Sequence, residues 1–98
     1  MKLRYTPAAT KDLSSIWDYS AEHWSPDQAD RYVLELEASC EALALRKLSG
    51  RPADEFRYRY LRLRSGSHYI FYRQHDDGGV DIIRVLHERM NFSKHLKK

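Results

Sequence analysis

Apolar residues first recur at helical spacing between positions 13 and 24. This stripe consists of Leu13, Ile16, Trp17, Ser20 and Trp24, of which Ser20 is the only weak member. Positions three, four, seven and eleven residues apart lie on one face of an α-helix. The pattern therefore predicts an amphipathic helix whose apolar face packs against the rest of the chain.

A second stripe follows and has the cleanest periodicity in the sequence. It consists of Ala29, Tyr32, Val33, Leu36, Cys40, Leu43 and Ala44. Because Cys40 lies on this stripe, we expect its thiol to be packed in the core and unreactive. Thr6-Pro7 and Ser25-Pro26 each place a capping hydroxyl before a proline that suits the first helical position. The short connection between the two stretches predicts an antiparallel helical hairpin.

Short apolar or alternating runs, bounded by turn residues, predict the strands. Leu3–Tyr5 is expected to be the first strand, and Arg57–Arg64, His68–Gln74 and Val80–Leu86 are expected to be three consecutive ones. The alternation within Arg57–Arg64 changes phase, so we expect a bulge near Tyr60-Leu61. The order β-α-α-β-β-β predicts an α+β fold in which the hairpin covers one face of an antiparallel sheet.

Length and composition indicate a single small globular domain over residues 1–98, with 42% hydrophobic and 32% charged residues. No stretch approaches the roughly 18 apolar residues that span a bilayer, and the first residues lack the apolar core of a signal peptide. We therefore expect a cytoplasmic protein without membrane contact. The single cysteine excludes an internal disulfide. Since there is no Gly-rich phosphate loop and no His-Glu pair at helical spacing, neither a metal nor a cofactor is expected.

Charge is distributed unevenly along the chain. Residues 1–45 contain four Lys or Arg and eight Asp or Glu, whereas residues 46–98 contain thirteen and six. The basic second half suggests an anionic partner, although a solvated polar face has the same composition. The overall net charge of +3 is mild for a protein whose affinity depends on phosphate contacts.

Five short stretches, taken in order, resemble the ParE/RelE toxin superfamily. They are Ile16–Tyr19, Asp27–Ala29, Gly50–Pro52, Ile70–Arg73 and Val80–Met90, of which the first three are similar to the ParE branch in particular. The resemblance implies a RelE-like fold, with a helical hairpin on an antiparallel sheet. It also implies a hetero-oligomer with a ParD-like antitoxin, whose N-terminal part binds DNA and whose C-terminal tail wraps the toxin. DNA would then be contacted only through the antitoxin.

The target that the resemblance implies depends on the branch. ParE toxins are understood to poison DNA gyrase without catalysis, whereas RelE toxins cut messenger RNA on the ribosome. In the ParE interpretation, the basic C-terminal segment Arg84–Lys98 is the expected gyrase-binding surface. Its candidate residues are Arg84, His87, Arg89, Met90 and Phe92. A third interpretation is a degenerate toxin that only binds its antitoxin and regulates their operon.

A RelE-like ribonuclease would need an acid or base and several cations around one phosphate. His87 is the candidate acid or base, because imidazole titrates near neutral pH. The candidate phosphate ligands are Arg84, Arg89 and Arg73. A histidine at the end of a strand often only hydrogen-bonds its neighbours, so a purely structural role is the competing interpretation.

Two sets of residues are expected to bind the antitoxin. The first consists of Arg57, Arg59, Arg62 and Arg64, because guanidinium groups suit the carboxylates of an acidic tail. The second consists of Tyr19, Trp24 and Tyr32, near the groove where an antitoxin helix would dock. Solvated arginines and ordinary core or rim packing are the alternatives for the two sets. Tyr58 and Tyr60 are expected to pack beneath the helices.

Overall fold

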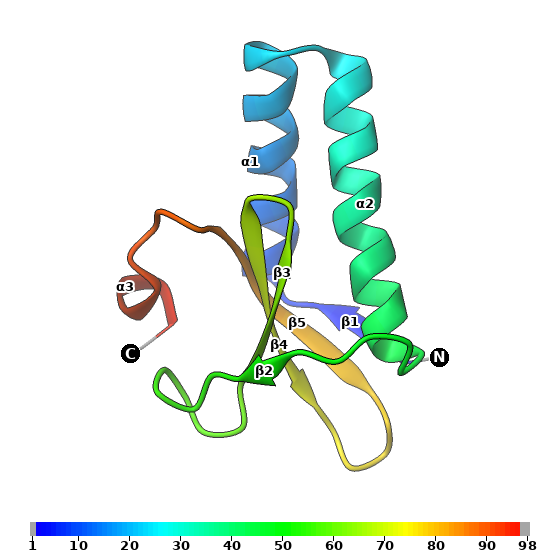
Figure 1. The fold of residues 1–98 in the computed structure, drawn as a ribbon, viewed down its shortest axis with the longest axis vertical. Coiled ribbons are helices and arrows are strands. Elements are labelled where there is room, and N and C mark those ends of the chain that lie inside the picture. The colour runs from blue at the N-terminus through cyan, green and yellow to red at the C-terminus, as the bar shows by residue number, and fades with distance from the viewer. Residues whose placement is uncertain (1, 97–98) are drawn as a thin grey trace.

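The computed structural model describes residues 2–96 and arranges them as a helical hairpin against a sheet. The elements are β1 (Leu3–Tyr5), α1 (Pro7–His23), α2 (Pro26–Ala44), β2 (Arg51–Pro52), β3 (Leu61–Ser65), β4 (His68–Gln74), β5 (Val80–His87) and α3 (Phe92–Leu96). The strands form one five-stranded sheet in the order β1-β5-β4-β3-β2 (Figure 1). The predicted α+β class and the helical hairpin on the sheet are confirmed.

The two long helices begin where their capping residues predict. The Thr6 hydroxyl accepts a hydrogen bond from the Ala9 N–H at 3.0 Å, and the Ser25 hydroxyl accepts one from the Gln28 N–H at 3.1 Å. A proline stands in the first turn of each helix, where its missing N–H costs nothing. The helices then run antiparallel, and the connection between them projects beyond the sheet (Figure 1).

The main core lies between the hairpin and the sheet. Its buried members are Ala9, Leu13, Ile16, Leu36, Cys40, Leu43, Ile70, Tyr72, Val80, Ile82 and Val85. Cys40 is fully buried, and burial raises the pKa of its thiol to about 11, so the thiol stays protonated at neutral pH. The prediction that Cys40 is a packing residue is confirmed. Trp24 is 60% exposed, so the buried stripe of α1 ends at Ser20.

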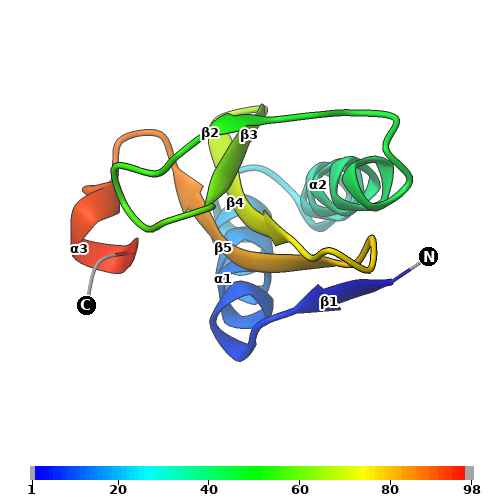
Figure 2. The same cartoon turned by 90° about the horizontal axis from the view of Figure 1, so that it is seen from below.

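A second, smaller core lies on the opposite face of the sheet. Its buried members are Ala53, Phe71, Leu86 and Leu96, with Phe56, Tyr60, Tyr69 and Phe92 packed around them. Figure 2 shows α3 on the side of the sheet away from α2. Both faces of the central strands are therefore covered, which explains the runs of buried residues in β4 and β5.

The sheet contains one parallel pair, in contrast to the wholly antiparallel arrangement that was expected. β1 runs parallel to β5, with Leu3 opposite Val80 and Tyr5 opposite Ile82, whereas β2 to β5 pair antiparallel in succession. This pairing brings the first strand of the chain next to the last one. A three-residue strand carries no local sign of its partner, so its direction of pairing is decided only when the core assembles.

The strand predicted at Arg57–Arg64 is wrong in its first half, because β3 begins only at Leu61. The preceding residues form a loop whose Phe56 ring packs in the second core. Within it, the Asp54 carboxylate accepts a hydrogen bond from the Arg59 N–H at 2.8 Å, and Arg59 has a φ of 68°. These contacts hold the segment in a turn and prevent it from extending.

Two further expectations for this region are also wrong. The register irregularity lies where β4 pairs with β5, between Phe71 and Tyr72, and not near the start of β3. Tyr58 is 82% exposed in the loop and does not pack beneath the helices. Tyr60 packs against the second core, on the face of the sheet away from the hairpin.

Candidate functional site

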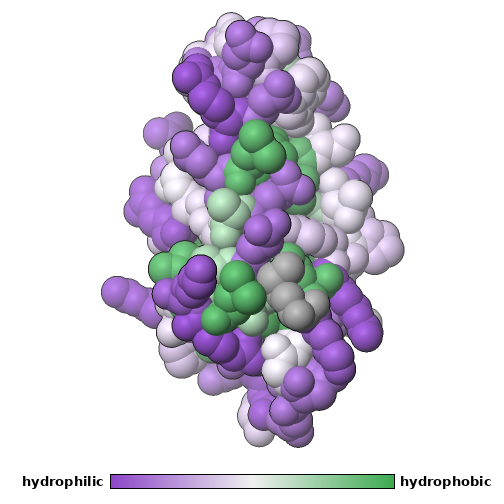
Figure 3. Space-filling view, turned by 90° about the vertical axis from the view of Figure 1, so that its right-hand side faces the viewer, coloured by the Kyte–Doolittle hydropathy of each residue, from purple (hydrophilic) through white to green (hydrophobic). Residues whose placement is uncertain are grey.

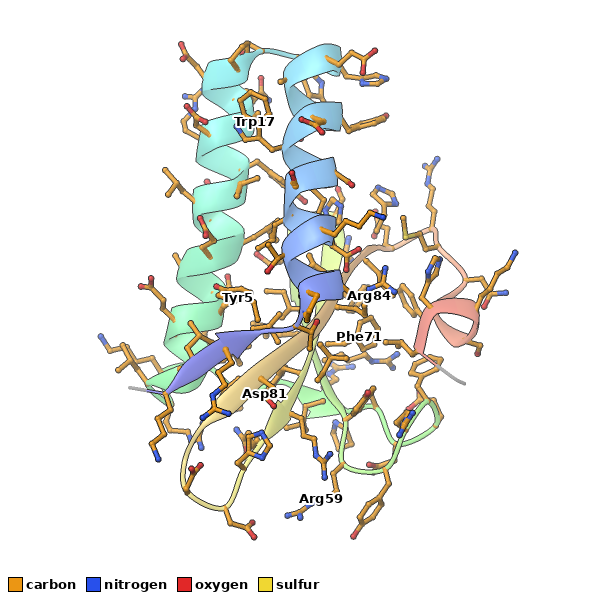
Figure 4. The ribbon with its side chains drawn as sticks, turned by 180° about the vertical axis from the view of Figure 1, so that it is seen from behind. Tyr5, Trp17, Arg59, Phe71, Asp81 and Arg84 are labelled. Atoms are coloured by element: carbon orange, nitrogen blue, oxygen red, sulfur yellow. The ribbon has the colours of Figure 1, made fainter. Side chains whose placement is uncertain are left out.

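Arg84 is held by a carboxylate from a distant part of the chain. Its Nε and Nη2 atoms donate to the two carboxylate oxygens of Asp12 at 2.7 and 2.8 Å. The two side chains are only 21% and 14% exposed, and the hydrogen bonds from Arg84 to Asp12 raise the pKa of Arg84. Arg84 lies at the base of α1 (Figure 4). Two of its five N–H donors are therefore used to fasten α1 to β5.

The Asp12 carboxylate also accepts a backbone hydrogen bond from β5, at a point where that strand has no neighbouring strand on the β1 side. β1 pairs with β5 only as far as Ile82. Beyond that point, the Thr6 hydroxyl donates to the Ile83 carbonyl at 2.7 Å, and Asp12 accepts the Val85 N–H at 3.0 Å. Buried backbone groups need such partners, so the start of α1 replaces the missing length of β1. No local pattern in the sequence pointed to Asp12.

His87 lies in a small polar cluster where α2 meets β4 and β5. It stands opposite His68 in the strand pairing, and the two ring centroids are 5.2 Å apart. The Tyr32 oxygen lies 2.6 Å from His68 Nδ1 and accepts the Ser67 N–H at 3.0 Å. Burial, and then the proximity of His87, lower the pKa of His68 to about 4. His68 is thus neutral at pH 7, and its contact with Tyr32 is a hydrogen bond between two uncharged groups.

His87 itself has the local hydrogen bond typical of a histidine at the end of a strand. Its Nδ1 accepts the backbone N–H of Arg89 at 3.1 Å. The side chain is partly buried, whereas Arg89 is exposed. This bond orients the imidazole and leaves only Nε2 for any external partner.

The residues considered for RNA cleavage do not converge on one point. Arg73 stands opposite Asp81 in the strand pairing, five positions along β4 from His68, which corresponds to roughly 16 Å. The Arg73 side chain projects from the face of the sheet away from the helices, because the adjacent Tyr72 points into the core beneath them. Since His87 shares the helix side with His68, one phosphate group cannot contact both His87 and Arg73.

Only two of the four arginines expected to bind an acidic tail lie on a strand. Arg62 and Arg64 project from the face of β3 away from the helices, because the leucines of this strand pack against the main core. Arg62 lies 3.6 Å from Glu55, and Arg64 lies 2.8 Å from Glu88. An acidic partner would therefore have to compete with carboxylates that already neutralise these two groups.

The other two arginines lie in the loop before β3. Arg59 has its guanidinium 3.6 Å from Asp76. Arg57 is exposed and makes no ion pair within the described residues. Arg59 lies at the end of the molecule remote from the hairpin connection (Figure 4). The structure therefore divides the predicted arginine set between a strand face and a loop.

The aromatic set divides in a similar way. Tyr19 stacks on His23 with centroids 3.8 Å apart, and Trp24 meets Tyr19 edge-on at 6.2 Å. Tyr19 and Trp24 are 56% and 60% exposed at the end of α1. Tyr32 lies apart from them, since its hydroxyl contacts β4 through His68. The structure thus brings Tyr19 and Trp24 together at the hairpin end and gives Tyr32 a role in joining the hairpin to the sheet.

The C-terminal segment is partly exposed and partly buried. Arg89 is exposed and Met90 is 47% exposed, immediately after β5. The ring of Phe92 lies 5.0 Å from that of Phe71 in the second core. Phe92 therefore anchors α3 to the sheet. The last two residues of the predicted segment, 97 and 98, lie outside the described residues.

Among residues 2–96, no three His, Cys, Asp or Glu side chains gather in a way that would hold a metal ion. No helix in that part of the chain is long and apolar enough to cross a membrane.

The sequence matches a family of toxins, and the fold matches a solved structure. Residues 3–92 match the family model described as "ParE toxin of type II toxin-antitoxin system, parDE". The chain is 41% identical over 98 residues to "Toxin ParE1" of Mycobacterium tuberculosis strains CDC 1551 / Oshkosh and ATCC 25618 / H37Rv, covering 98% of this chain and 100% of each relative. It is 43% identical over 93 residues to "Toxin ParE1" of Caulobacter vibrioides, covering 95% of both chains. A solved chain titled "Chromosomal ParDE TA system from P. aeruginosa" shares the fold, with a TM-score of 0.74 at 21% identity, covering 89% of this chain and 95% of that one.

Proposed function

The chain belongs to the ParE toxin family of type II toxin–antitoxin systems, and from this premise we propose that it arrests growth by binding and inhibiting DNA gyrase. A cognate antitoxin neutralises it in the cytoplasm by occupying the toxic surface. The toxin acts by association with a macromolecule and carries out no catalysis of its own.

The observation that carries this proposal is the separation of the groups that RNA cleavage would need. Arg84 is engaged by Asp12, and Arg73 lies on the other face of the sheet from His87. Metal-independent cleavage needs an acid, a base and cations around the same phosphate. The geometry supports a binding mechanism because, of the three expected phosphate ligands, only Arg89 remains next to His87.

The target surface centres on the exposed end of β5. Arg89 and Met90 are the exposed members, with the free edge of the His87 ring beside them. Exposed Arg and Met side chains are common at protein interfaces. Arg84 and Phe92 act here as positioning residues, since they fasten the two sides of this segment to α1 and to the second core.

The antitoxin binds two regions in this proposal. Its acidic stretch meets Arg62 and Arg64, with Arg57 and Arg59 in reach of the same chain, and its apolar residues meet Tyr19 and Trp24 at the hairpin end. The oxygen of Tyr32 is already engaged, so Tyr32 contributes only the edge of its ring. DNA is contacted only through the antitoxin, within a hetero-oligomer.

Charge reversal tests the arginine contribution. Arg62→Glu combined with Arg64→Glu should weaken binding of the operon antitoxin by at least about tenfold, because two charge-assisted contacts become repulsive. Arg4→Glu combined with Lys11→Glu is the matched control, since it makes the same change of net charge at exposed positions on β1 and α1. Equal affinities for the two double variants would remove the arginines from the antitoxin interface.

The test of the function is a gyrase supercoiling and DNA-cleavage assay with purified toxin, with and without its antitoxin. We expect inhibition or trapped cleavage complexes that the antitoxin relieves, and His87→Ala should retain much of this effect. The opposite result is no effect on gyrase at concentrations well above those that arrest growth, together with loss of toxicity and of messenger RNA cleavage in His87→Ala. That result would establish a RelE-like ribonuclease.

A further inference from the structure

α2 carries a second apolar stripe that the fold does not bury. It consists of Leu34, Ala38 and the C-cap residue Leu45, at intervals of four and seven residues, a spacing that places them within about 40° of one another around the helix axis. They lie opposite the side that buries Leu36 and Cys40. Leu34 is 63% exposed and Leu45 is 50% exposed, so the stripe faces solvent.

The stripe continues beyond the helix as a patch. Leu48, three residues after Leu45, is 42% exposed. Figure 3 views this side of the molecule and shows apolar surface running from the middle of the hairpin down to the lower part of α2, with hydrophilic atoms on both sides and one interruption. A single exposed leucine is ordinary, but a row of them bordered by polar groups marks an interaction surface.

Carboxylates outnumber cations beside the part of the stripe that lies on α2. Glu35, Glu37 and Glu41 stand there against Arg31, while Arg46 and Lys47 lie at the lower end between Leu45 and Leu48. Residues 7–44, which form the hairpin, contain two Lys or Arg and eight Asp or Glu. A second copy of this chain packed on the stripe would bring these carboxylates together, and like charges at close range oppose association. The charge therefore favours a partner that presents basic groups around an apolar row.

We propose that the outer face of α2 binds a basic amphipathic helix of the antitoxin, with apolar side chains on Leu34, Ala38 and Leu45 and Lys or Arg beside the glutamates. An amphipathic helix laid along an apolar stripe uses anchors at intervals of three, four and seven residues, which is the spacing found here. This inference rests on the proposed neutralisation by an antitoxin and specifies the chemistry of the segment that performs it.

The position of the stripe beside β3 favours the antitoxin as the protein that supplies the docking helix. α2 runs beside β3, where the Ser39 and Ser65 hydroxyls lie 3.2 Å apart. One continuous chain that crosses the edge of the sheet at this end of β3 would join the arginine face to the outer face of α2. Its two stretches would have opposite charge, with an acidic stretch for Arg62 and Arg64 and a basic one for the hairpin.

The test measures the affinity of the purified toxin for the antitoxin encoded in the same operon, by calorimetry at low and moderate salt. Leu34→Lys should weaken binding by about tenfold or more, because it removes the most exposed leucine of the stripe and adds a repulsive charge. Gln28→Lys is the matched control, since it adds the same side chain to an exposed position of α2 about 120° from Leu34, and should leave the affinity within about twofold. Glu35→Lys with Glu41→Lys should weaken binding and reduce its salt dependence.

The outcomes separate this inference from the proposed function. If wild-type toxin binds the antitoxin and Leu34→Lys binds equally well, with an unchanged thermal melt, the stripe is not the docking site and the inference fails alone. If wild-type toxin self-associates in sedimentation and Leu34→Lys is monomeric, a second copy occupies the stripe and the inference is again overturned. If wild-type toxin neither inhibits gyrase nor binds the antitoxin, the proposed function fails.

Discussion

Replacing Asp12 with alanine is expected to lower the free energy of unfolding by about 3 kcal/mol. The carboxylate accepts hydrogen bonds from Arg84 Nε, Arg84 Nη2 and the Val85 N–H at 2.7, 2.8 and 3.0 Å. Removing it leaves a guanidinium group that is only 21% exposed without its counter-ion, and a strand N–H without an acceptor. Loss of one partner of a buried pair costs about 3–5 kcal/mol, and the lower end applies because solvent still reaches both side chains.

The measurement is urea and thermal denaturation followed by circular dichroism. A domain of this size is stable by only about 5–15 kcal/mol, so the variant should melt about 12 °C or more below the wild type. Asp12→Asn, which retains one acceptor oxygen, should fall between the two. Lys2→Ala is the control, because it removes an ion pair to Asp77 whose side chains are 62% and 56% exposed, and it should cause no measurable change. If Asp12→Ala is as stable as Lys2→Ala, the ion pair does not hold α1 on β5.

The remaining predictions concern the polar cluster and the loop before β3. The fold lowers the pKa of His68 from its ordinary value near 6.5 to about 4, so the unfolded chain binds its proton more tightly; stability should be complete above pH 6.5 and fall as pH drops toward 4. Urea midpoints of His68→Phe should show a smaller decline over this range, and an identical decline would contradict the prediction. Tyr32→Phe should cost about 1 kcal/mol, because the Ser67 N–H and His68 Nδ1 lose their shared partner. Arg59→Gly should raise stability by about 0.5 kcal/mol, since φ is 68°, and a decrease would mean that the contact of Arg59 with Asp76 outweighs the strain.

Local signals predicted most of the regular structure. The helix starts were predicted from Thr6 and Ser25, whose hydroxyls do accept the free N–H groups of the first turn. The limits of β4, His68–Gln74, agree with the prediction, because turn residues bound it on both sides. The apolar stripe of the second helix correctly placed Cys40 in the core. Each of these features depends on residues within a few positions of one another.

The predictions from local pattern were wrong where contacts with distant residues determine the conformation. Arginine and tyrosine alternate in the loop before β3 as they would in a strand, but the burial of Phe56 and the hydrogen bond to Asp54 turn the chain there. The four arginines consequently do not share one surface. The candidate site is affected in the same way, because the sequence pattern indicates a binding role for Arg84, whereas the fold pairs its guanidinium group with Asp12.

By itself, the sequence determined the two long helices, the two central strands, the division into an acidic and a basic half, and the family. Each of these depends on the spacing of nearby residues or on the order of short motifs. Only the tertiary structure decided that β1 pairs parallel to β5, that Arg84 is bound to a residue 72 positions away, and that His87 and Arg73 lie on opposite faces. It also showed that a second apolar row along α2, which includes Leu34 and Leu45, remains exposed. The physical reason is that hydrogen bonds, ion pairs and burial between distant segments depend on packing, whereas periodicity describes only which residues share a face.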